Sequence, residues 1–580
     1  MIRLLKYLTK KELLLMIISI ILIYVDAHFT LRMPDYMAEI TKLVQTEGSK
    51  MSDILTNGGY MMLCAGICLI CDIIIGYFIA YISCNFSKNV RKKLFLHVES
   101  LSNQDIKEIS TSSLITRTTN DITQVEMFLT MGSLMLFKAP ITAGMAVVKI
   151  LNKNYTWSML TAGTLLILLI TIIIITTIVV PRFKKIQKLT DDLNNATREN
   201  LTGVRVVRAF NAEDYQENKF DKVNKDLTSN LLFNQSMFSI MQPTMYLVLN
   251  TLTLGIYYFG AKMIYVESIS NKLPLFGDMI VFSSYAMQVI MSFLMLAMIF
   301  MMMPRASVSA KRINEVLNKK ASIKEGNDNK KSKESGTVEF KNVSFKYPDA
   351  DEYVLKDISF KANKGETVAF IGMTGSGKST LINLIPRFYD VTEGSVLVNN
   401  INVKDYKEET LNDKLGYVSQ KPIIFNGTVN FNISFGKKIS DKKIKEAARI
   451  AKANEFIEKM EDNYSSHIAS SGTNISGGQK QRISIARAIA KDPEIYIFDD
   501  AFSALDYKTD FELRKGLKKY TKDATVLIVA QRIGTIMNAD KIIVLDDGKC
   551  VGVGTHKDLL KTCKIYKNIA LSQLSEEELS

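Results

Sequence analysis

The first half of the chain is a series of long apolar stretches separated by polar, charged segments. A helix needs about 20 apolar residues to cross the hydrocarbon core of a bilayer, and six stretches reach or approach this length. The fourth, which ends before Pro181, is the clearest, whereas the third contains Lys138 and Pro140 and is the weakest. The pattern predicts an all-α transmembrane domain at residues 1–310 with six spans, at about 12–29, 59–85, 127–150, 157–181, 238–262 and 276–303.

The second half is polar and has a different periodicity. Residues 311–336 lose hydrophobicity and contain the run NDNKKSKESG, which has the composition of a linker. Beyond them, short β-branched and aromatic runs alternate with helical stretches, which is typical of an α/β domain with a largely parallel sheet. We therefore predict a linker at 311–336 and a second domain at 337–580, with strands at 337–345, 366–372, 495–500, 525–530 and 541–548.

Basic residues accumulate beside the spans and predict their orientation. Four Lys or Arg residues precede the first span, and further clusters lie in the long polar stretches 86–126 and 182–237, whereas the connection after Lys149 is very short. Cytoplasmic loops of membrane proteins carry such an excess of Lys and Arg. We predict a multi-pass protein of the plasma membrane with both termini and the second domain in the cytoplasm.

The net charge of +14 has the same explanation. Because the basic residues cluster beside spans rather than with aromatic platforms, we predict no nucleic-acid partner. The six cysteines predict neither disulfides nor a zinc site. Cys64, Cys68 and Cys71 share one face of an apolar helix, where they pack as small apolar side chains.

A glycine-rich loop follows the strand-like run VAFI and opens a helical run at Ser379. The backbone N–H groups of such a loop cradle phosphates, while its lysine, Lys378, reaches the β- and γ-phosphates and Ser379 ligates Mg²⁺. Asp499 ends the apolar strand IYIF, where a carboxylate holds the magnesium through its water shell. The chain is therefore predicted to bind a nucleoside triphosphate with Mg²⁺. The predicted phosphate loop consists of Gly372, Met373, Thr374, Gly375, Ser376, Gly377, Lys378, Ser379 and Thr380.

The segment NISGGQKQRISIARAI, which contains Ser476, Gly477, Gly478 and Gln479, resembles the signature of ABC ATPases. A membrane domain followed by an ATPase domain resembles one half of an exporter-type ABC transporter, most closely the heterodimeric bacterial multidrug-type exporters. In that family two ATPase domains face head to tail, and each nucleotide lies between one phosphate loop and the opposite signature. The resemblance thus implies that these four residues act on ATP held by a partner.

The same resemblance assigns roles to other residues of the second domain. Tyr347 resembles the aromatic residue that stacks on adenine, and Gln420 resembles the glutamine that contacts magnesium and the attacking water. The loop from Ser503 to Asp506 resembles the one that links opposite sites. With Ser379 and Asp499, Gln420 completes the implied magnesium site.

Two positions depart from the family pattern. Asp500 stands where a glutamate usually orients and deprotonates the attacking water, and Gln531 stands where a histidine is usual. Aspartate is one methylene shorter, and a displacement of about 1 Å costs roughly 10²-fold in rate. Glutamine donates a hydrogen bond but carries no positive charge and shuttles no proton. We predict that Asp500, Gln531 and Gln420 form a site that binds ATP and hydrolyses it slowly.

The signature, in contrast, differs from the usual pattern only by Ile475. A chain with a weak site and an intact signature is suited to complete the competent site of a second half-transporter that supplies the missing Glu and His.

By resemblance, the loops near 103–116 and 205–217, with turn-like breaks at 110–113 and 211–214, contain the coupling helices that touch the ATPase domains. The predicted function is ATP-driven export of amphipathic compounds, namely drugs, lipids or peptides.

The substrate route is less defined by the sequence. Asp72, within the second span, is a candidate for contact with a cation or substrate, with Lys138 as an alternative internal partner. Flexible thioethers suit a promiscuous apolar pocket but also ordinary packing. In the sixth span they are Met279, Met287, Met291, Met295 and Met298.

Two other functions are compatible with the same sequence. The first is an importer of metal chelates built on the exporter fold; measuring uptake against efflux in vesicles would identify it. The second is a non-transporting subunit that senses ATP and regulates a partner; in that case the complex would show no vectorial flux. Six spans with long helical loops favour transport, because a regulator needs no cavity.

Overall fold

The computed structural model describes residues 2–151, 155–266, 269–328 and 332–575. The chain forms two units: the first comprises Met1–Glu99 and Ser110–Lys319, and the second comprises Ser100–Ile109 and Lys320–Ser580. Residues 329–331 of the predicted linker and 576–580 of the predicted second domain lie outside the described residues, as does residue 1.

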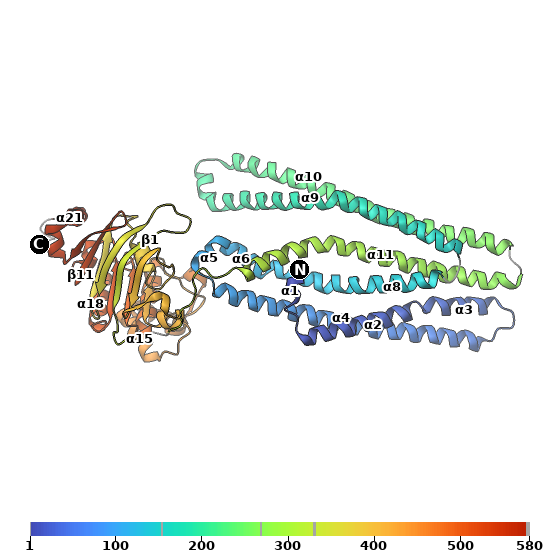
Figure 1. Ribbon diagram of the computed structural model, residues 1–580, viewed down its shortest axis with the longest axis horizontal. Coiled ribbons are helices and arrows are strands. Elements are labelled where there is room, and N and C mark those ends of the chain that lie inside the picture. Colours follow the sequence, from blue (N-terminus) through green and yellow to red (C-terminus); the bar gives the residue numbers. More distant parts are fainter. Residues whose placement is uncertain (1, 152–154, 267–268, 329–331, 576–580) are drawn as a thin grey trace. The chain divides into compact units, whose positions relative to one another are not determined.

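The first unit consists of long helices (Figure 1). Within the part of the chain that the structure describes, six helical segments are long and apolar enough to cross a membrane, which confirms the prediction of six spans. Each predicted span lies inside a longer helical segment, because lipid offers no partner to backbone N–H and C=O groups and a helix satisfies them internally. The helices are α1 (Ile2–Leu5), α2 (Lys10–Thr30), α3 (Met33–Gln45), α4 (Met51–Glu99), α6 (Thr111–Thr118), α7 (Asn120–Met127), α8 (Ser133–Leu151), α9 (Tyr155–Ala209), α10 (Glu213–Val266) and α11 (Ile269–Asn318).

Helix α4 shows how one face of a span is fixed by its side chains. Cys64, Cys68, Cys71, Ile75 and Ile79 recur at intervals of three and four residues and are all buried. This spacing keeps a single stripe of the helix against its neighbours. The three cysteines thus pack as small apolar residues on the face that the sequence predicts.

A cluster of three charged residues joins α2, α4 and α8. Lys138 Nζ lies 2.9 Å from Asp26 Oδ2 and 2.9 Å from Asp72 Oδ1. The Asp26 side chain is 2% exposed, whereas that of Asp72 is 53% exposed. Lys138 is therefore the internal partner considered for Asp72, and Asp26 is a second partner that the sequence pattern does not indicate.

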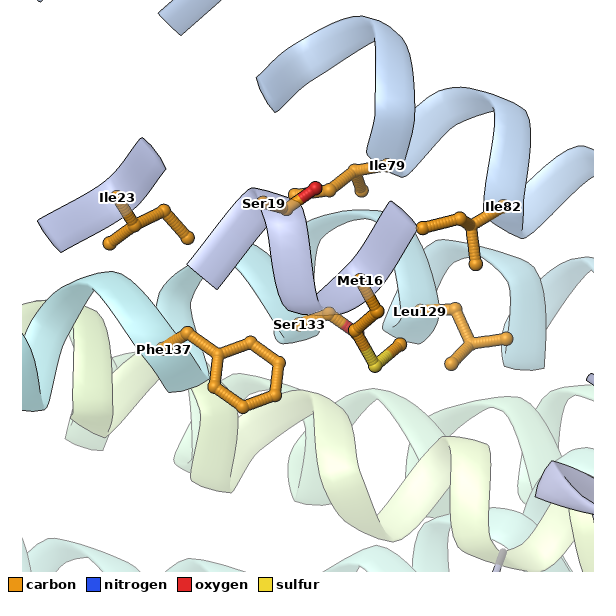
Figure 2. A pocket seen from close by; sticks show the side chains of 8 residues that line it. All are labelled: Met16, Ser19, Ile23, Ile79, Ile82, Leu129, Ser133 and Phe137. Atoms are coloured by element: carbon orange, nitrogen blue, oxygen red, sulfur yellow. The ribbon is translucent and has the colours of Figure 1, made fainter. Parts of the chain in front are cut away.

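The third span contains a π-helix, η1 (Phe128–Gly132), between α7 and α8. Its wider turn lies beside a small pocket lined by Met16, Ser19 and Ile23 of α2, Ile79 and Ile82 of α4, Leu129 of η1, and Ser133 and Phe137 of α8 (Figure 2). The Ser19 hydroxyl donates to the Leu15 carbonyl at 2.8 Å. The lining is otherwise mostly apolar, so this pocket is a packing gap rather than a site with chemistry.

The breaks in the two long polar loops fall at residues with positive φ. Ser110 has φ 69° between α5 (Asn103–Ile109) and α6, and Asn211 has φ 49° between α9 and α10. The first loop contains the predicted short helix, α5, and this helix belongs to the second unit. The second loop differs from the prediction: residues 205–217 contain only the end of α9, a turn and the start of α10. The left-handed residue at Asn211 reverses the chain within three residues, which leaves no length for a separate helix.

The last membrane helix is longer than the sequence predicts. Helix α11 continues to Asn318, eight residues into the predicted linker. Ile313 and Val316 are fully buried. Their burial stabilises the added turns although the surrounding residues are polar.

The second unit is an α/β domain with two main sheets. The larger sheet has six strands in the order β12-β11-β3-β10-β9-β6, and all neighbours are parallel except β11 and β12. This confirms the predicted α/β class. A second, antiparallel sheet in the order β2-β1-β4-β5 was not predicted. The strands are β1 (Val338–Phe345), β2 (Leu355–Ala362), β3 (Thr367–Gly372), β4 (Glu393–Val398), β5 (Ile401–Asn402), β6 (Leu415–Val418), β7 (Gly427–Thr428), β8 (His467–Ile468), β9 (Ile495–Asp499), β10 (Thr525–Val529), β11 (Lys541–Asp546) and β12 (Lys549–Gly554).

Apolar layers cover both faces of the large sheet. In β9, Tyr496 and Phe498 belong to one buried cluster while Ile495 and Ile497 belong to the other. Successive side chains of a strand point to opposite faces, so a strand that is buried on both must be continuously apolar. The helices of this unit are α5, α12 (Lys378–Asn383), α13 (Glu408–Asp413), α14 (Val429–Ser434), α15 (Asp441–Ile450), α16 (Asn454–Ile457), α17 (Gly477–Lys491), α18 (Tyr507–Tyr520), α19 (Ile533–Ile536), α20 (His556–Thr562) and α21 (Lys564–Leu571).

Helix α5 is held in the second unit by a buried carboxylate. Asp105 Oδ2 accepts from the backbone N–H of Ser102 (3.1 Å) and Ser322 (3.0 Å), and from both of their hydroxyls (2.7 and 3.1 Å). Burial acts to raise the pKa of Asp105, but these four donors hold it below its usual value. Lys107 of the same helix donates to the Tyr389 hydroxyl at 3.2 Å.

Replacing Lys138 by methionine should destabilise the first unit by about 3–5 kcal/mol, because it leaves two carboxylates without their cation in the membrane layer. The measurement is the denaturant midpoint of the purified chain in detergent. The matched control adds Asp26→Asn and Asp72→Asn to the lysine variant, which should recover most of the loss. Equal midpoints for the wild type and the Lys138→Met variant would show that the ion pairs contribute nothing, and equal losses in the single and triple variants would show that unpaired carboxylates are not the cause.

Replacing Asp105 by alanine should release α5 from the segment at Ser322, with about ten- to hundredfold faster hydrogen exchange of both, since each charge-assisted hydrogen bond contributes about 1.5–3 kcal/mol. The lowered pKa gives the sign of the pH effect. The stabilisation is complete above the ordinary carboxyl pKa of about 3.9 and is lost as the pH falls through the lowered value. Gln104→Ala is the control, because the Gln104 side chain donates to Glu108 within α5. Unchanged exchange in Asp105→Ala contradicts the role.

Candidate nucleotide-binding site

Four of the predicted site residues end or follow four neighbouring parallel strands, β3, β10, β9 and β6. Gly372 ends β3 and Asp499 ends β9, while Gln531 and Gln420 each lie two residues beyond β10 and β6. Parallel strands present their carboxyl ends at one edge of a sheet, which is where ligands of open α/β sheets bind. The topology therefore brings residues far apart in the sequence to one place.

The phosphate loop between β3 and α12 takes a conformation that its glycines permit. Gly375 and Gly377 have φ of 89° and 91°. A Cβ on Gly377 would lie 2.8 Å from Leu355 Cδ2, whereas one on Gly375 would meet no atom within 4 Å. A Cβ on Gly372 would clash with the Leu545 carbonyl oxygen. The loop is thus closely packed on its protein side and open at Gly375, as a backbone cradle for phosphate requires.

Lys378 begins α12, and its ammonium group lies over the loop. Lys378 Nζ donates to the carbonyl oxygens of Gly372 (2.8 Å) and Met373 (2.7 Å) and to Ser376 Oγ (3.3 Å). Burial lowers the pKa of Lys378, and the charges of Asp500 and Asp499 oppose this shift. A cation held here can reach an anion bound to the same loop.

Ser379 and Asp499, two predicted magnesium ligands, lie in direct contact. Ser379 Oγ donates to Asp499 Oδ1 at 2.8 Å. Burial raises the pKa of Asp499 and the neighbouring Asp500 adds to the shift, while Ser379 and Lys378 oppose it. A hydroxyl and a carboxylate oxygen are hard ligands of the kind that Mg²⁺ prefers, so the residues present fit this ion.

The three predicted catalytic residues meet at one carboxylate oxygen. Asp500 Oδ2 accepts from Gln531 Nε2 at 2.9 Å and from Gln420 Nε2 at 3.3 Å. The Asp500 residue is 8% exposed, and its backbone has φ 47°. Burial raises the pKa of this carboxyl, whereas the hydrogen bond from Gln420 lowers it. Two neutral amides, neither of which can take up a proton, therefore surround the predicted catalytic carboxylate.

Tyr347, the predicted adenine-stacking residue, lies against the helix that carries the phosphate loop. Its hydroxyl is 3.0 Å from Thr380 Oγ1. Its ring forms edge contacts with Phe345 and Tyr389, at centroid distances of 5.0 and 5.2 Å. These contacts fix the orientation of the ring next to the loop.

The signature residues form the N-terminus of α17. Ser476 caps the helix: its side chain accepts from the Gln479 N–H at 3.3 Å, and Gln479 Oε1 accepts from the Ser476 N–H at 2.8 Å. A Cβ on Gly477 would meet no atom within 4 Å. Among the described residues, no hydrogen bond or ion pair links the signature, residues 476–479, to the phosphate loop, residues 372–380. A helix N-terminus with an uncovered glycine can offer N–H donors to an anion from outside.

The predicted inter-site loop is tied to the catalytic segment. Ser503 Oγ donates to the Asp500 carbonyl at 2.8 Å, and the Ser503 carbonyl accepts from Arg532 at 3.3 Å. Asp506 accepts from the Thr509 N–H at 2.9 Å and caps α18. This hydrogen bond lowers the pKa of Asp506. The loop therefore couples the backbone at Asp500 to the start of a helix.

Gln573 is a residue of this site that the sequence did not indicate. Its Oε1 accepts from the Ile533 N–H at 2.8 Å, and its Nε2 donates to the Gln531 carbonyl at 2.8 Å. One side chain beyond α21 thus brackets the backbone on both sides of Arg532 and fixes the segment that carries Gln531. A lone glutamine after a short helix has no spacing or composition that marks it, so only the structure locates it.

Two regions of the chain match known families. Residues 16–293 match the ABC transporter transmembrane region, and residues 355–503 match the ABC transporter family. An uncharacterized ABC transporter ATP-binding protein of Mycobacterium bovis is 36% identical, with 93% of each chain covered. The Bacillus subtilis protein YgaD, named as a candidate multidrug export ATP-binding/permease protein, is 32% identical over 85% of this chain and 84% of its own.

A solved structure of a bacterial Atm1-family ABC exporter with ATP bound has the same fold, with a TM-score of 0.82 and 23% sequence identity, and 98% of this chain and 99% of that chain are covered. The fold and the site define a half-transporter that joins a six-span membrane domain to an ATP-binding domain. The chain belongs to the ABC transporter family, with a multi-span membrane region and an ATP-binding domain.

Replacing Gln573 by alanine should free the segment that carries Gln531, because it removes both hydrogen bonds. We expect faster hydrogen exchange at the Ile533 amide and a two- to tenfold weaker affinity for ATP, since a neutral hydrogen bond contributes about 0.5–1.5 kcal/mol. Gln573→Glu keeps the acceptor for the Ile533 amide but loses the donor to the Gln531 carbonyl. Its affinity for ATP should therefore lie between those of the wild type and Gln573→Ala.

The control is Ser572→Ala, because the Ser572 hydroxyl donates to the Ile569 carbonyl, away from Gln531. If Gln573 acts by placing Gln531, its replacement should add little in a Gln531→Ala background. Fully additive losses of affinity in the double variant would mean that Gln573 has only a general structural role.

Proposed function

We propose that this chain is the degenerate-site subunit of a heterodimeric exporter: it binds ATP with Mg²⁺, hydrolyses it slowly, and completes a faster site on its partner. The observation that carries the proposal is the hydrogen bonding of Asp500 by two glutamine amides. We assign transport to residues 1–310 and ATP binding to residues 337–580, joined by residues 311–336, of which the first eight continue helix α11.

Nucleotide binding is assigned to the phosphate loop, residues 372–380, with Tyr347 stacking on the adenine ring. Ser379, Asp499 and Gln420 would hold Mg²⁺, which neutralises charge on the phosphate oxygens when bound. The closeness of Ser379 and Asp499 supports this set. Lys378, already directed over the loop, supplies a positive charge to the terminal phosphates.

Slow hydrolysis follows from the groups that surround the attacking water. Asp500 must take a proton from that water, yet its Oδ2 already accepts from Gln531 and Gln420. Its carboxylate also stands one methylene short of the glutamate position. The Gln531 amide can donate to a γ-phosphate but offers no charge and no proton transfer. Binding is thus retained while the chemical step loses both of its specialised groups.

The partner half-transporter would carry the catalytic Glu and His that this chain lacks. Ser476, Gly477, Gly478 and Gln479 act on the ATP of that partner through the uncovered N-terminus of α17. Through the loop from Ser503 to Asp506, the backbone at Asp500 is joined to α18, which gives one site a mechanical path to the other.

The transported compounds are proposed to be amphipathic drugs, lipids or peptides, moved out across the plasma membrane with both termini and the ATPase domain in the cytoplasm. The name of YgaD supports export of varied compounds. Of the methionines in the sixth span, Met279 is buried, whereas Met287, Met291 and Met298 are exposed. The exposed three are available to a mobile apolar ligand.

The test is ATP hydrolysis by the chain alone and by its complex with the half-transporter encoded beside it. Changing the partner's catalytic glutamate to glutamine should lower turnover of the complex roughly 10²-fold, whereas Asp500→Asn in this chain should change it by less than about threefold. Asp500→Glu combined with Gln531→His should then restore turnover in the complex with the inactive partner.

Lys378→Ala is the control for nucleotide binding, because it removes the cation from the phosphate loop and leaves Asp500 and Gln531 in place. Robust turnover by this chain alone, lost on Asp500→Asn, would overturn the proposal, since it would show that Asp500 is a sufficient base.

A further inference from the structure

A second pocket in the first unit lies between α7, η1, α9, α10 and α11. It has a volume of about 270 Å³ and is partly open. Three aromatic rings line it, those of Phe128, Phe183 and Phe238, and the last two have centroids 6.5 Å apart. This space suits a ring system or the upper part of an acyl chain rather than a whole drug-sized molecule.

Among the described residues, the pocket lining has one charged member, Arg305 of α11, and one neutral polar member, Gln124 of α7. The Arg305 guanidinium lies 5.7 Å from the centroid of the Phe183 ring. No carboxylate among the described residues forms an ion pair with Arg305. A planar cation with five donors is thus presented beside aromatic rings without a protein anion to neutralise it.

The pocket also lies where two apolar stretches end. In α9 the apolar run finishes at Pro181, just before Phe183, and in α11 it finishes at Met303 and Pro304, just before Arg305. A ligand at this level has hydrocarbon on one side and polar medium on the other. Met127 and Met302 complete the apolar lining and can adapt to rings or chains of different shape.

The wall formed by η1 has the wider turn of a π-helix, a feature often found at functional sites. Phe128 begins this turn and lines the pocket. A Cβ added to Gly132 would lie 3.1 Å from Phe128 Cδ2. Glycine at 132 therefore leaves room for the Phe128 ring at the pocket wall.

We propose that this pocket binds an amphiphile with an acidic head group, which Arg305 pairs with while Phe128, Phe183 and Phe238 contact its aromatic or acyl body. The ligand is either an acidic membrane lipid or an acidic exported compound. This inference deepens the proposed export function and rests on it only for the fate of the ligand, because binding itself needs no ATP.

The test uses the full chain in nanodiscs of phosphatidylcholine without ATP. Two fluorescent probes share the same ring system: anilinonaphthalene sulfonate carries an acidic group, and phenylnaphthylamine does not. Arg305→Gln should raise the Kd of the sulfonate about tenfold and change that of the neutral probe by less than about twofold. Arg305→Lys should retain most of the sulfonate affinity, whereas Phe238→Ala should weaken both probes.

Arg182→Gln is the matched control, because the Arg182 guanidinium stacks on Phe233 at 3.5 Å and does not line the pocket. An equal loss in Arg182→Gln and Arg305→Gln would overturn the proposal, since binding would then follow surface charge. So would an unchanged sulfonate Kd in Arg305→Gln, or an equal loss for the two probes.

Adding phosphatidylglycerol distinguishes the two sources of the ligand. Competition with the sulfonate in the wild type but not in Arg305→Gln assigns the site to a lipid, and no competition assigns it to an exported compound. None of these results bears on Asp500, so the two proposals fail separately.

Discussion

In the membrane layer every polar group must find its partner within the protein, and much of the first unit follows from this constraint. Backbone groups are satisfied by long helices, which continue through Pro140, Pro181 and Pro243. Charged side chains meet the same requirement. Lys149 Nζ lies near the Tyr285 hydroxyl (2.9 Å) and the Leu31 carbonyl (3.2 Å), so that the ends of α2, α8 and the middle of α11 are joined through one ammonium group.

The second unit satisfies its polar groups differently, at the edge of a sheet. Strands buried on both faces have few polar side chains, and the polar residues collect in the loops beyond their carboxyl ends. Asp500 is the clearest case: a carboxylate at the end of β9 is matched by amides that follow β10 and β6.

Periodic and local features could be predicted from the sequence. Six spans, the alternating strands and the phosphate loop each depend on a short pattern, and the contact of Ser379 with Asp499 follows from strand order once the sheet is parallel. Features that depend on distant pairs could not. Asp26 reaches Lys138 across 112 residues, and no pattern in α2 distinguishes it from an ordinary acidic residue at the end of a span.

The two differences between the predicted and observed elements, a strand that was not predicted and a helix that is not present, also have physical reasons. Strand β2 has the alternating burial of an antiparallel sheet, but its exposed positions are Lys, Ser and Asp, which also suit a loop. The absent helix near 205–217 depends on the backbone conformation of a single residue, Asn211. Asparagine is compatible with either outcome, so the sequence could place the break but not its shape.

The backbone conformation of Asp500 has a consequence for how such a site evolves. With φ 47°, the residue occupies the left-handed region, which asparagine and aspartate tolerate better than most side chains because their short polar groups bond locally. The fold therefore favours the shorter acid at this point, while fast chemistry favours the longer one. Under the proposed division of labour between two sites, the shorter acid lowers the local backbone strain and the rate of hydrolysis together.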